Sequence, residues 1–176
     1  QAALQLAKRS SGESKVELLS LDEERRRGFF RLPPPDPGDV FFDMEGDPFE
    51  PGGLDYLFGV RFFENDKPCF RAFWGHNREE ERQAFGEFMD FIGERMQRRP
   101  AMHIYHYAHY EPIALKRLMS LHGTREAQVD DLLRRGMLVD LYKVVREAIR
   151  TSEAGLSLKD IEALYGFDRQ IGVEFA

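Results

Sequence analysis

Residues 41–48 read Phe41-Phe42-Asp43-Met44-Glu45-Gly46-Asp47-Pro48, and this stretch decides the expected fold. In an extended strand, residues i and i+2 share a face, so Asp43 and Glu45 project together while Phe42 and Met44 point into a core. Neighbouring acids repel each other and cost stability unless a cation or polar partners neutralise them. Carboxylate oxygens on a rigid strand suit magnesium or manganese. The stretch therefore predicts a metal-dependent site of the kind that nucleases use.

The alternative is that both acids are exposed, on an edge strand or in the loop beside Gly46. We favour a central, buried strand, because the apolar residues Val40, Phe41 and Phe42 directly precede the pair. Buried acids need ligands or hydrogen-bond partners. Taken alone, the pattern D-x-E is weak, since many strands carry it by chance.

The composition indicates a globular protein with a packed core. The chain has 176 residues, 42% hydrophobic and 12% aromatic, which fits one domain with an additional arm. The net charge of −6 excludes the overall basic balance of a passive nucleic-acid coat, yet leaves room for local basic patches. The single Cys69 excludes an internal disulfide framework and favours a reducing cytoplasm. No apolar run approaches the ~18 residues of a membrane span, so we expect a cytoplasmic protein with no membrane partner.

Two segments are expected. Residues 1–37 are interpreted as a connector, because charges separate the leucines and the run Pro33-Pro34-Pro35-Asp36-Pro37 favours stiff, extended backbone. Residues 38–176 form the expected compact domain. The chain begins at Gln1 and reaches Ala176 with no closing helix. We therefore expect a piece of a longer protein, truncated before its last helix.

The hydrophobic periodicities predict an α/β domain of the mixed-sheet kind, with helices on both faces. Three antiparallel strands come first, and helix-connected strands follow. In chain order the expected elements are strands 40–45, 54–63 and 68–74, helix 78–99 capped by Asn77, strand 102–107, helix 113–121, a helix capped by Thr124 and ending at Gly136, strand 137–139, and helices 141–150 and 157–165.

A second group of polar residues lies at the expected junction between strand 102–107 and the next helix. Glu111 in this group could join Asp43 and Glu45 and complete a three-carboxylate site, enough for two divalent ions ~3.5–4 Å apart. By itself, Glu111 could equally be an acid favoured near a helix N-terminus. His103, His106 and His109 would suit zinc only on a helix, which the aromatic, β-favouring stretch argues against. Tyr105, Tyr107 and Tyr110 could stack on bases, although packing against neighbouring strands is the default interpretation.

Asp140 follows a short strand and precedes a helix. Capping that helix is the default interpretation, and support of the metal site from a second layer is the alternative. Several cations could contact a nucleic-acid backbone, although most surface cations are simply solvated; they are Lys116, Arg117, Arg134, Arg135, Lys143, Arg146 and Arg150.

In this order, the motifs resemble the DEDD exonuclease superfamily, which has the RNase H-like fold. More closely, they resemble the predicted RNase H-like nuclease domains of proteins with RecB-like nuclease and helicase segments. Asp43-Met44-Glu45 is similar to the first motif, D-x-E, and His106 to Leu115 is similar to the second, H-N-x-x-F-D followed by an apolar helix. Val139-Asp140-Leu141 and the run Leu156 to Gly166 resemble the segments before the third motif. The resemblance covers roughly residues 39–168.

The resemblance implies a two-metal nuclease of the 3′–5′ exonuclease type. Asp43, Glu45 and Glu111 would hold two Mg²⁺ or Mn²⁺ ions, with Asp140, His106 and His109 as possible supporting residues. The nucleic acid, DNA or RNA with a single-stranded end, would contact Tyr107, Tyr110, Lys116 and Arg117. Partner domains of the parent chain would be a helicase or a RecB-like nuclease.

Two departures from the family pattern are visible. Glu111 replaces the usual Asp, and the third motif, which supplies a fourth carboxylate and a general base, is absent; the Tyr165 to Asp168 stretch has the wrong spacing. We therefore expect this chain alone to have little nuclease activity. An inactive nucleic-acid-binding or docking module is the alternative, and an endonucleolytic RNase H-like enzyme is a third possibility.

Overall fold

Two units make up the chain in the computed structural model, which describes residues 1–20, 24 and 26–167. One, here called the sheet unit, comprises Leu32–Leu141. The other, the hairpin unit, combines Gln1–Arg31 with Tyr142–Ala176. The boundaries expected from the sequence, 1–37 and 38–176, stay a prediction.

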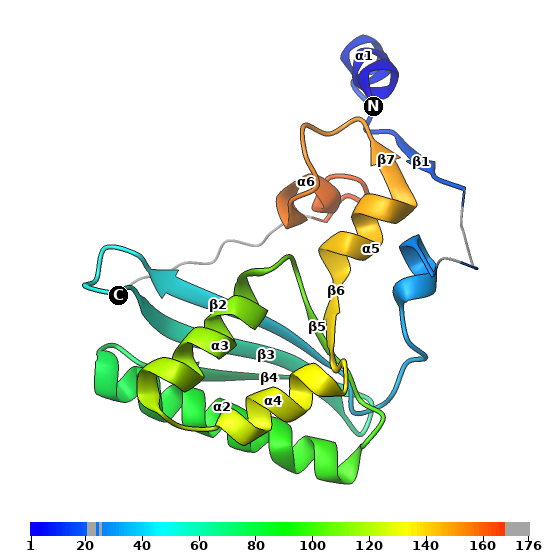
Figure 1. Ribbon diagram of the computed structural model, residues 1–176. Coiled ribbons are helices and arrows are strands. Elements are labelled where there is room, and N and C mark those ends of the chain that lie inside the picture. Colours follow the sequence, from blue (N-terminus) through cyan, green and yellow to red (C-terminus); the bar gives the residue numbers. More distant parts are fainter. Residues whose placement is uncertain (21–23, 25, 168–176) are drawn as a thin grey trace. The chain divides into compact units, whose positions relative to one another are not determined.

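The sheet unit is built on five strands in the spatial order β4-β3-β2-β5-β6 (Figure 1). The strands are β2 (Val40–Asp47), β3 (Leu54–Glu64), β4 (Lys67–Trp74), β5 (Ile104–His106) and β6 (Leu138–Asp140). The first three pair antiparallel, whereas β5 runs parallel to both β2 and β6. The expected mixed sheet is therefore confirmed, and β2 lies at its centre as predicted.

Three helices cover one face of this sheet (Figure 1): α2 (Arg78–Arg98), α3 (Tyr110–His122) and α4 (Glu126–Arg134). All three contribute to a single hydrophobic core with the buried side of β2, which carries Val40, Phe42 and Met44. Burial of these apolar side chains is the main driving force for folding. Helices on the second face stay a prediction, because α5 (Leu141–Ala148) and α6 (Leu158–Glu162) lie largely in the hairpin unit.

Local signals explain where the longest helix begins. Asn77 accepts hydrogen bonds from the backbone N–H groups of Glu79 and Glu80, as predicted for the N-cap of α2. The prediction for α4 was wrong by one residue, since its N-cap is Arg125 in a left-handed conformation, not Thr124. Helix α3 begins at Tyr110, two residues before Pro112, so Glu111 lies inside its first turn.

The hairpin unit contains elements that the sequence analysis did not predict. These are α1 (Ala2–Ser11), β1 (Val16–Leu18), the 3₁₀ helix η1 (Gly28–Arg31) and β7 (Ile149–Thr151). Strand β1 pairs antiparallel with β7, and Glu147 of α5 accepts hydrogen bonds from Gly28 and Arg31 of η1. Ser157 and Asp160 form a capping box at the start of α6.

Candidate functional site

The two acids of β2 lie on the sheet face opposite the helices. Phe42 and Met44 are buried in the core, whereas Asp43 and Glu45 are exposed, so the predicted alternation is confirmed. The expectation that the acids themselves are buried was wrong. Across the sheet, Asp43 faces Gly59 and Glu45 faces Leu57 of β3, and the register shifts directly after Glu45. Small or half-buried neighbours thus leave both residues exposed on this face of the sheet.

Glu111 is in contrast buried, with 2% of its surface exposed. Its carboxylate Oε2 lies 3.5 Å from Nδ1 of His106, which ends β5 and is equally buried. Both atoms lack a hydrogen-bond partner among the described residues. A buried polar atom without a partner costs free energy. A divalent cation that prefers oxygen ligands would supply the missing partner of the Glu111 carboxylate.

The turn between His106 and Glu111 has an unusual backbone. Ala108 has a φ of 75°, in the left-handed region that costs L-residues energy. The backbone N–H of Ala108 donates to Oδ1 of Asp140 at 3.1 Å, so the end of β6 holds this turn in place. Both roles expected for Asp140, as a supporting residue of a metal site and as a helix cap, stay predictions.

Electrostatics link Asp43 with the other two acids. The pKa of Asp43 is raised above its usual value, chiefly because part of the side chain is desolvated, and further because of the negative charges of Glu111 and Glu45. A hydrogen-bonding interaction with Glu111 acts in the same direction, and one from the backbone of Met44 opposes it. The fold therefore brings Asp43 close enough to Glu111 and to Glu45 for their negative charges to act on it.

Beside these acids lies a polar cluster that the sequence analysis missed. Asp55 of β3 is buried and accepts hydrogen bonds from Tyr110 at 2.6 Å and from Arg117. Burial, then the contact with Asp55, raises the pKa of Tyr110 to about 12. Gly46 adjoins the cluster, and a Cβ there would lie 2.5 Å from the Tyr110 hydroxyl. The position of Asp55 directly after Leu54 in a strand pattern was the one available signal for a buried acid.

The cluster extends toward α2 through a second buried acid. The backbone N–H of Asp55 donates to Glu81, which also contacts Arg78 at 2.6 Å and His122 at 2.8 Å. These contacts join β3, α2 and α3 around the end of the sheet. Tyr110 and Arg117 thus take part in the contacts of this cluster, and the nucleic-acid contacts that the resemblance implies for them stay a prediction.

The remaining predicted residues surround the same helix start. Lys116 is exposed on α3, and His109 is an exposed N-cap that makes no capping bond with its side chain. Tyr107 is partly buried between β5 and α3. The segment from His103 to His106 enters β5, so it is a strand and turn as predicted, not a helix.

The carboxylate oxygens of the three acids have the chemistry that a hard divalent cation requires, but their positions do not form a ligand group. All three acids offer oxygen ligands, which magnesium and manganese prefer. In the part of the chain that the structure describes, however, no three His, Cys, Asp or Glu side chains form a group that could hold a metal ion as they stand. Asp43 and Glu45 are exposed, so rotation of their side chains toward Glu111 meets little packing resistance.

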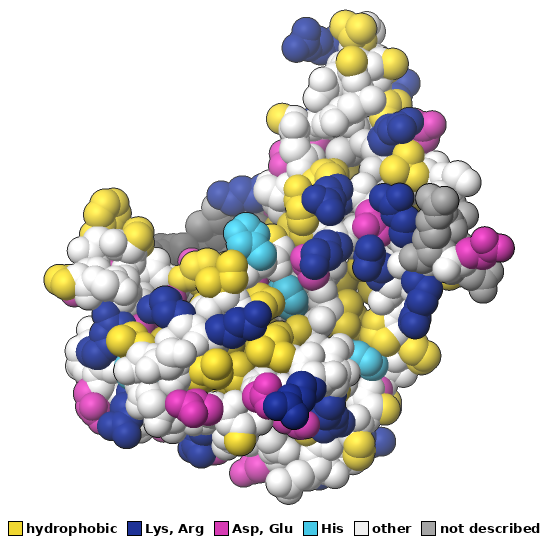
Figure 2. All heavy atoms as spheres, viewed as in Figure 1, with side chains coloured by type: hydrophobic (Ala, Val, Ile, Leu, Met, Phe, Trp, Pro, Cys, Tyr) yellow, Lys and Arg dark blue, Asp and Glu magenta, His cyan; other side chains and the backbone are white. Residues whose placement is uncertain are grey.

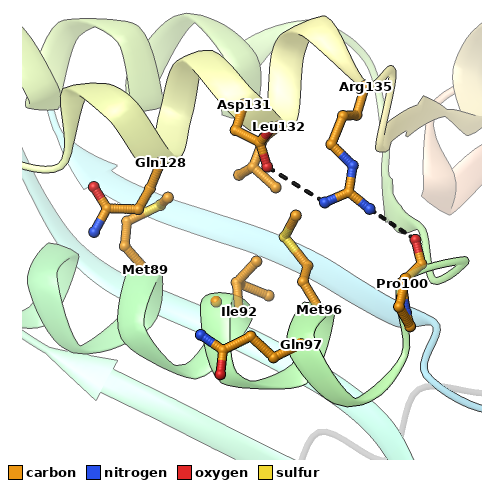
Figure 3. Close-up of a pocket in the computed structure, with 10 residues that line it drawn as sticks. Met89, Ile92, Met96, Gln97, Pro100, Gln128, Asp131, Leu132 and Arg135 are labelled. Atoms are coloured by element: carbon orange, nitrogen blue, oxygen red, sulfur yellow. Dashed lines mark hydrogen bonds and ion pairs between the residues drawn. The ribbon is translucent and has the colours of Figure 1, made fainter.

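Several cavities lie in the sheet unit, and one of them adjoins the acids. A cleft of about 490 Å³ is lined by Glu45, Gly46 and Asp47 on one side and by Tyr110 and Arg117 on the other. A cavity of about 370 Å³ between α2 and α4 is lined mainly by Met89, Ile92, Met96 and Leu132, while Arg135 reaches across to Pro100 (Figure 3). A larger cavity, of about 940 Å³, is lined by Asp36, Asp39 and Glu64 together with Arg95, but by none of the three predicted acids. The first cleft is lined by Glu45, so it marks the candidate site.

Charged side chains are mixed on the face shown in Figure 2. Lys and Arg are spread among acidic and hydrophobic groups there. None of the helices within the described residues is long and apolar enough to cross a membrane.

Comparison with known proteins supports the fold. A family model described as the RNase_H superfamily matches residues 40–174, which include most of the sheet unit and continue beyond it. Neither the curated proteins nor the solved structures contain a match. RNase H-like proteins are usually nucleases that use divalent metals, which indicates a nuclease-like or nucleic-acid-binding function. Because the family model covers well over half of the chain and the strand order agrees with a mixed RNase H-like sheet, this chain belongs to the RNase H superfamily.

Proposed function

We propose that the chain is a divalent-metal-dependent nuclease domain that hydrolyses phosphodiester bonds, of the DEDD-like 3′–5′ exonuclease type. It would act within a larger DNA- or RNA-processing protein that also carries helicase or RecB-like nuclease segments. The observation that supports this proposal most is the position of Asp43 near both Glu111 and Glu45, whose negative charges add to partial desolvation in raising the pKa of Asp43. Repelling carboxylates are costly unless a cation joins them.

Each residue has a defined part in this proposal. Asp43, Glu45 and Glu111 would hold two Mg²⁺ or Mn²⁺ ions, which when bound would lower the pKa of a water and stabilise the leaving oxygen. His106 would support Glu111, because its Nδ1 lies 3.5 Å from that carboxylate. Asp140 accepts a hydrogen bond from the backbone of Ala108 and so holds the turn that precedes Glu111. The cleft beside Glu45 would admit the end of a nucleic-acid strand.

Manganese binding tests the proposal. Because a ligand that binds only the folded state stabilises it by mass action, Mn²⁺ is expected to raise the melting temperature, by the equivalent of about 2.7 kcal/mol at 100 times its Kd. Asp43→Asn should abolish this rise. Asp66→Asn is the matched control, since Asp66 lies in the exposed turn between β3 and β4 and should respond like the wild type. An equal rise in Asp43→Asn would refute the site.

A second candidate function is a nucleic-acid-binding or docking module without catalysis. It is favoured by the exposed positions of Asp43 and Glu45 and by the lack of a preformed three-ligand group among the described residues. Retained oligonucleotide binding with no Mn²⁺-dependent shift would select this function. Where cleavage occurs, product lengths from end-labelled strands distinguish exonuclease from endonuclease action.

A further inference from the structure

The sheet face that carries Asp43 and Glu45 also carries a row of aromatic rings and one cation. Strand pairing places Phe70 of β4 opposite Arg61 of β3, Arg61 opposite Phe41 of β2, and Phe41 beside Tyr105 of β5. Residues that pair directly across neighbouring strands share a face. These four side chains, here called the aromatic row, therefore cross the sheet from its β4 edge toward its centre.

Most of the aromatic row is open to solvent. Phe70 is 68% exposed and Phe41 45%, although exposed aromatic rings forgo the large gain that burial gives them. Tyr105 is buried and stacks on Phe41 with 5.3 Å between ring centroids, which holds the Phe41 ring from one side. The Phe70 ring reaches over Gly59, where a Cβ would lie 3.5 Å from it. Packing thus positions both rings while leaving their surfaces free.

Arg61 lies between the two exposed rings and is exposed itself. No acidic side chain in residues 1–20, 24 and 26–167 forms an ion pair with it. An unpaired guanidinium flanked by aromatic rings is a combination that holds phosphates and stacks bases along a single strand. The charge and the rings therefore match one class of ligand.

The aromatic row is continuous with the candidate site. Asp43 follows Phe41 by two residues on the same face of β2, which is a distance of about 7 Å along a strand. Glu45 lies one further step away, opposite Leu57, and Leu57 in turn pairs with Trp74 of β4. Trp74 is 53% exposed and stacks on Tyr56 and His76. A single strand of nucleic acid that lay on this face would pass from the aromatic rings to Asp43 and Glu45.

We propose that the aromatic row binds single-stranded nucleic acid, with bases stacking on Phe70 and Phe41 and a phosphate on Arg61. This inference rests on the proposed function, because the row would guide a strand toward the acids that cut it. Double-stranded nucleic acid, whose bases are already stacked, cannot use the rings in this way.

Intrinsic fluorescence offers a direct test, since Trp74 is the only tryptophan of the chain and lies on the same face. The full chain is titrated in EDTA, which prevents metal-dependent cleavage, with 15-mers of oligo(dT) and of oligo(rU). We expect saturable quenching or a spectral shift by at least one of them and weaker binding of a 15-bp duplex. No response to either single strand, or equal binding of the duplex, would overturn the proposal.

Variants distinguish base stacking from non-specific hydrophobic binding. Phe70→Leu should weaken binding about tenfold, in line with the loss of one stacking ring, whereas Phe70→Tyr keeps a ring and should bind like the wild type. Leu121→Ala is the control, because Leu121 is also apolar and exposed but lies on α3. Unchanged binding by Phe70→Leu would exclude the row as the binding surface.

The charge has its own test. For a single strand, each phosphate contact contributes about 0.7 to the slope of log affinity against log salt. Arg61→Gln should lower that slope by about this amount. Arg82→Gln removes the same charge from α2, on the other side of the sheet, and should leave the slope unchanged. An equal change in both variants would show a non-specific charge effect and overturn the assigned phosphate contact.

Two further results discriminate between explanations. The wild type could show a doubled molecular mass in solution that Phe70→Leu returns to the monomer. This result would mean that a second copy of the chain, and not nucleic acid, covers the β4 edge. The Mn²⁺-dependent rise in melting temperature should persist in Phe70→Leu. If that rise persists but the wild type does not bind the oligonucleotides, only this inference fails. If the wild type binds them but shows no rise, only the proposed metal site fails.

Discussion

At the scale of single residues, Gly46 leaves room for two polar side chains at the end of β2. An added Cβ would lie 2.5 Å from the hydroxyl of Tyr110 and 2.8 Å from Oδ1 of Asp55. Gly46→Ala is therefore expected to destabilise the protein by about 1–3 kcal/mol, as overpacking usually does. Denaturation in urea measures this loss.

A double-mutant cycle identifies the cause. Tyr110→Phe removes the closest atom, so Gly46→Ala should cost less in that background than in the wild type. Costs that simply add would contradict the proposed clash. Within this cycle, the single variant Tyr110→Phe reports how much stability is lost when the buried carboxylate of Asp55 loses its hydrogen bond from the Tyr110 hydroxyl.

The sequence allowed some residue positions to be predicted and not others. Alternation along a strand was enough to place Asp43 and Glu45 on one face, because that rule is local. It could not show that their face is left open by α2 to α4, which depends on how distant helices pack. The contact between Asp140 and Ala108 likewise depends on the pairing of β5 with β6.

At the scale of elements, Glu147 joins α5 to η1. Its hydrogen bond with Arg31, then that with the backbone of Gly28, lowers the pKa of Glu147 from 4.5 to about 2. A carboxyl with a depressed pKa in the folded state stabilises the fold above its unfolded pKa, and this contribution is lost as the pH falls through the folded pKa. We therefore expect the hairpin unit to lose stability between pH 4.5 and about 2.

Glu147→Gln tests this link. The variant should be less stable than the wild type at pH 6, and the difference should shrink toward pH 2, as followed by thermal unfolding. Glu79→Gln is the control, because Glu79 lies on the exposed start of α2 and has only a loose contact with Arg82. A stability difference that stays constant with pH would rule out the assigned contact.

Long elements were predictable and short ones were not. Strands β2 to β4 and helix α2 carry several repeats of their hydrophobic period, which is the signal that sequence analysis uses. Strands β1 and β7 have three residues each and pair with each other from opposite ends of the described chain. Such pairing leaves no local pattern, so residues 1–37 were interpreted as a connector.

At the scale of the whole molecule, apolar burial is uneven. The main hydrophobic cluster extends from Val40 to Met137 and lies within the sheet unit, whereas the described part of the hairpin unit buries only Val144, Ala148 and Ile161 among its hydrophobic side chains. Helix α1 has no buried residue, and β1 is exposed along its length. Regions with few buried contacts open with less free energy than the core.

Hydrogen exchange read by mass spectrometry should therefore be uneven as well. Backbone amides of β2 and β3 are expected to exchange slowest, through global unfolding, whereas those of α1 and β1 should exchange much faster. The exchange of a fully denatured sample corrects for intrinsic rates. Equal protection of α1 and β2 would contradict this expectation.

The parallel pairing of β2 with β5 has a consequence for how the protein matures. Asp43 and Glu111 are separated along the chain by β3, β4 and α2, and they meet only after β5 has joined β2. Contacts between such distant segments form late, because the intervening loop must close first. On a ribosome, the emerging chain therefore carries fully hydrated acids while its hydrophobic segments collapse. Their repulsion arises only once the core is in place to withstand it.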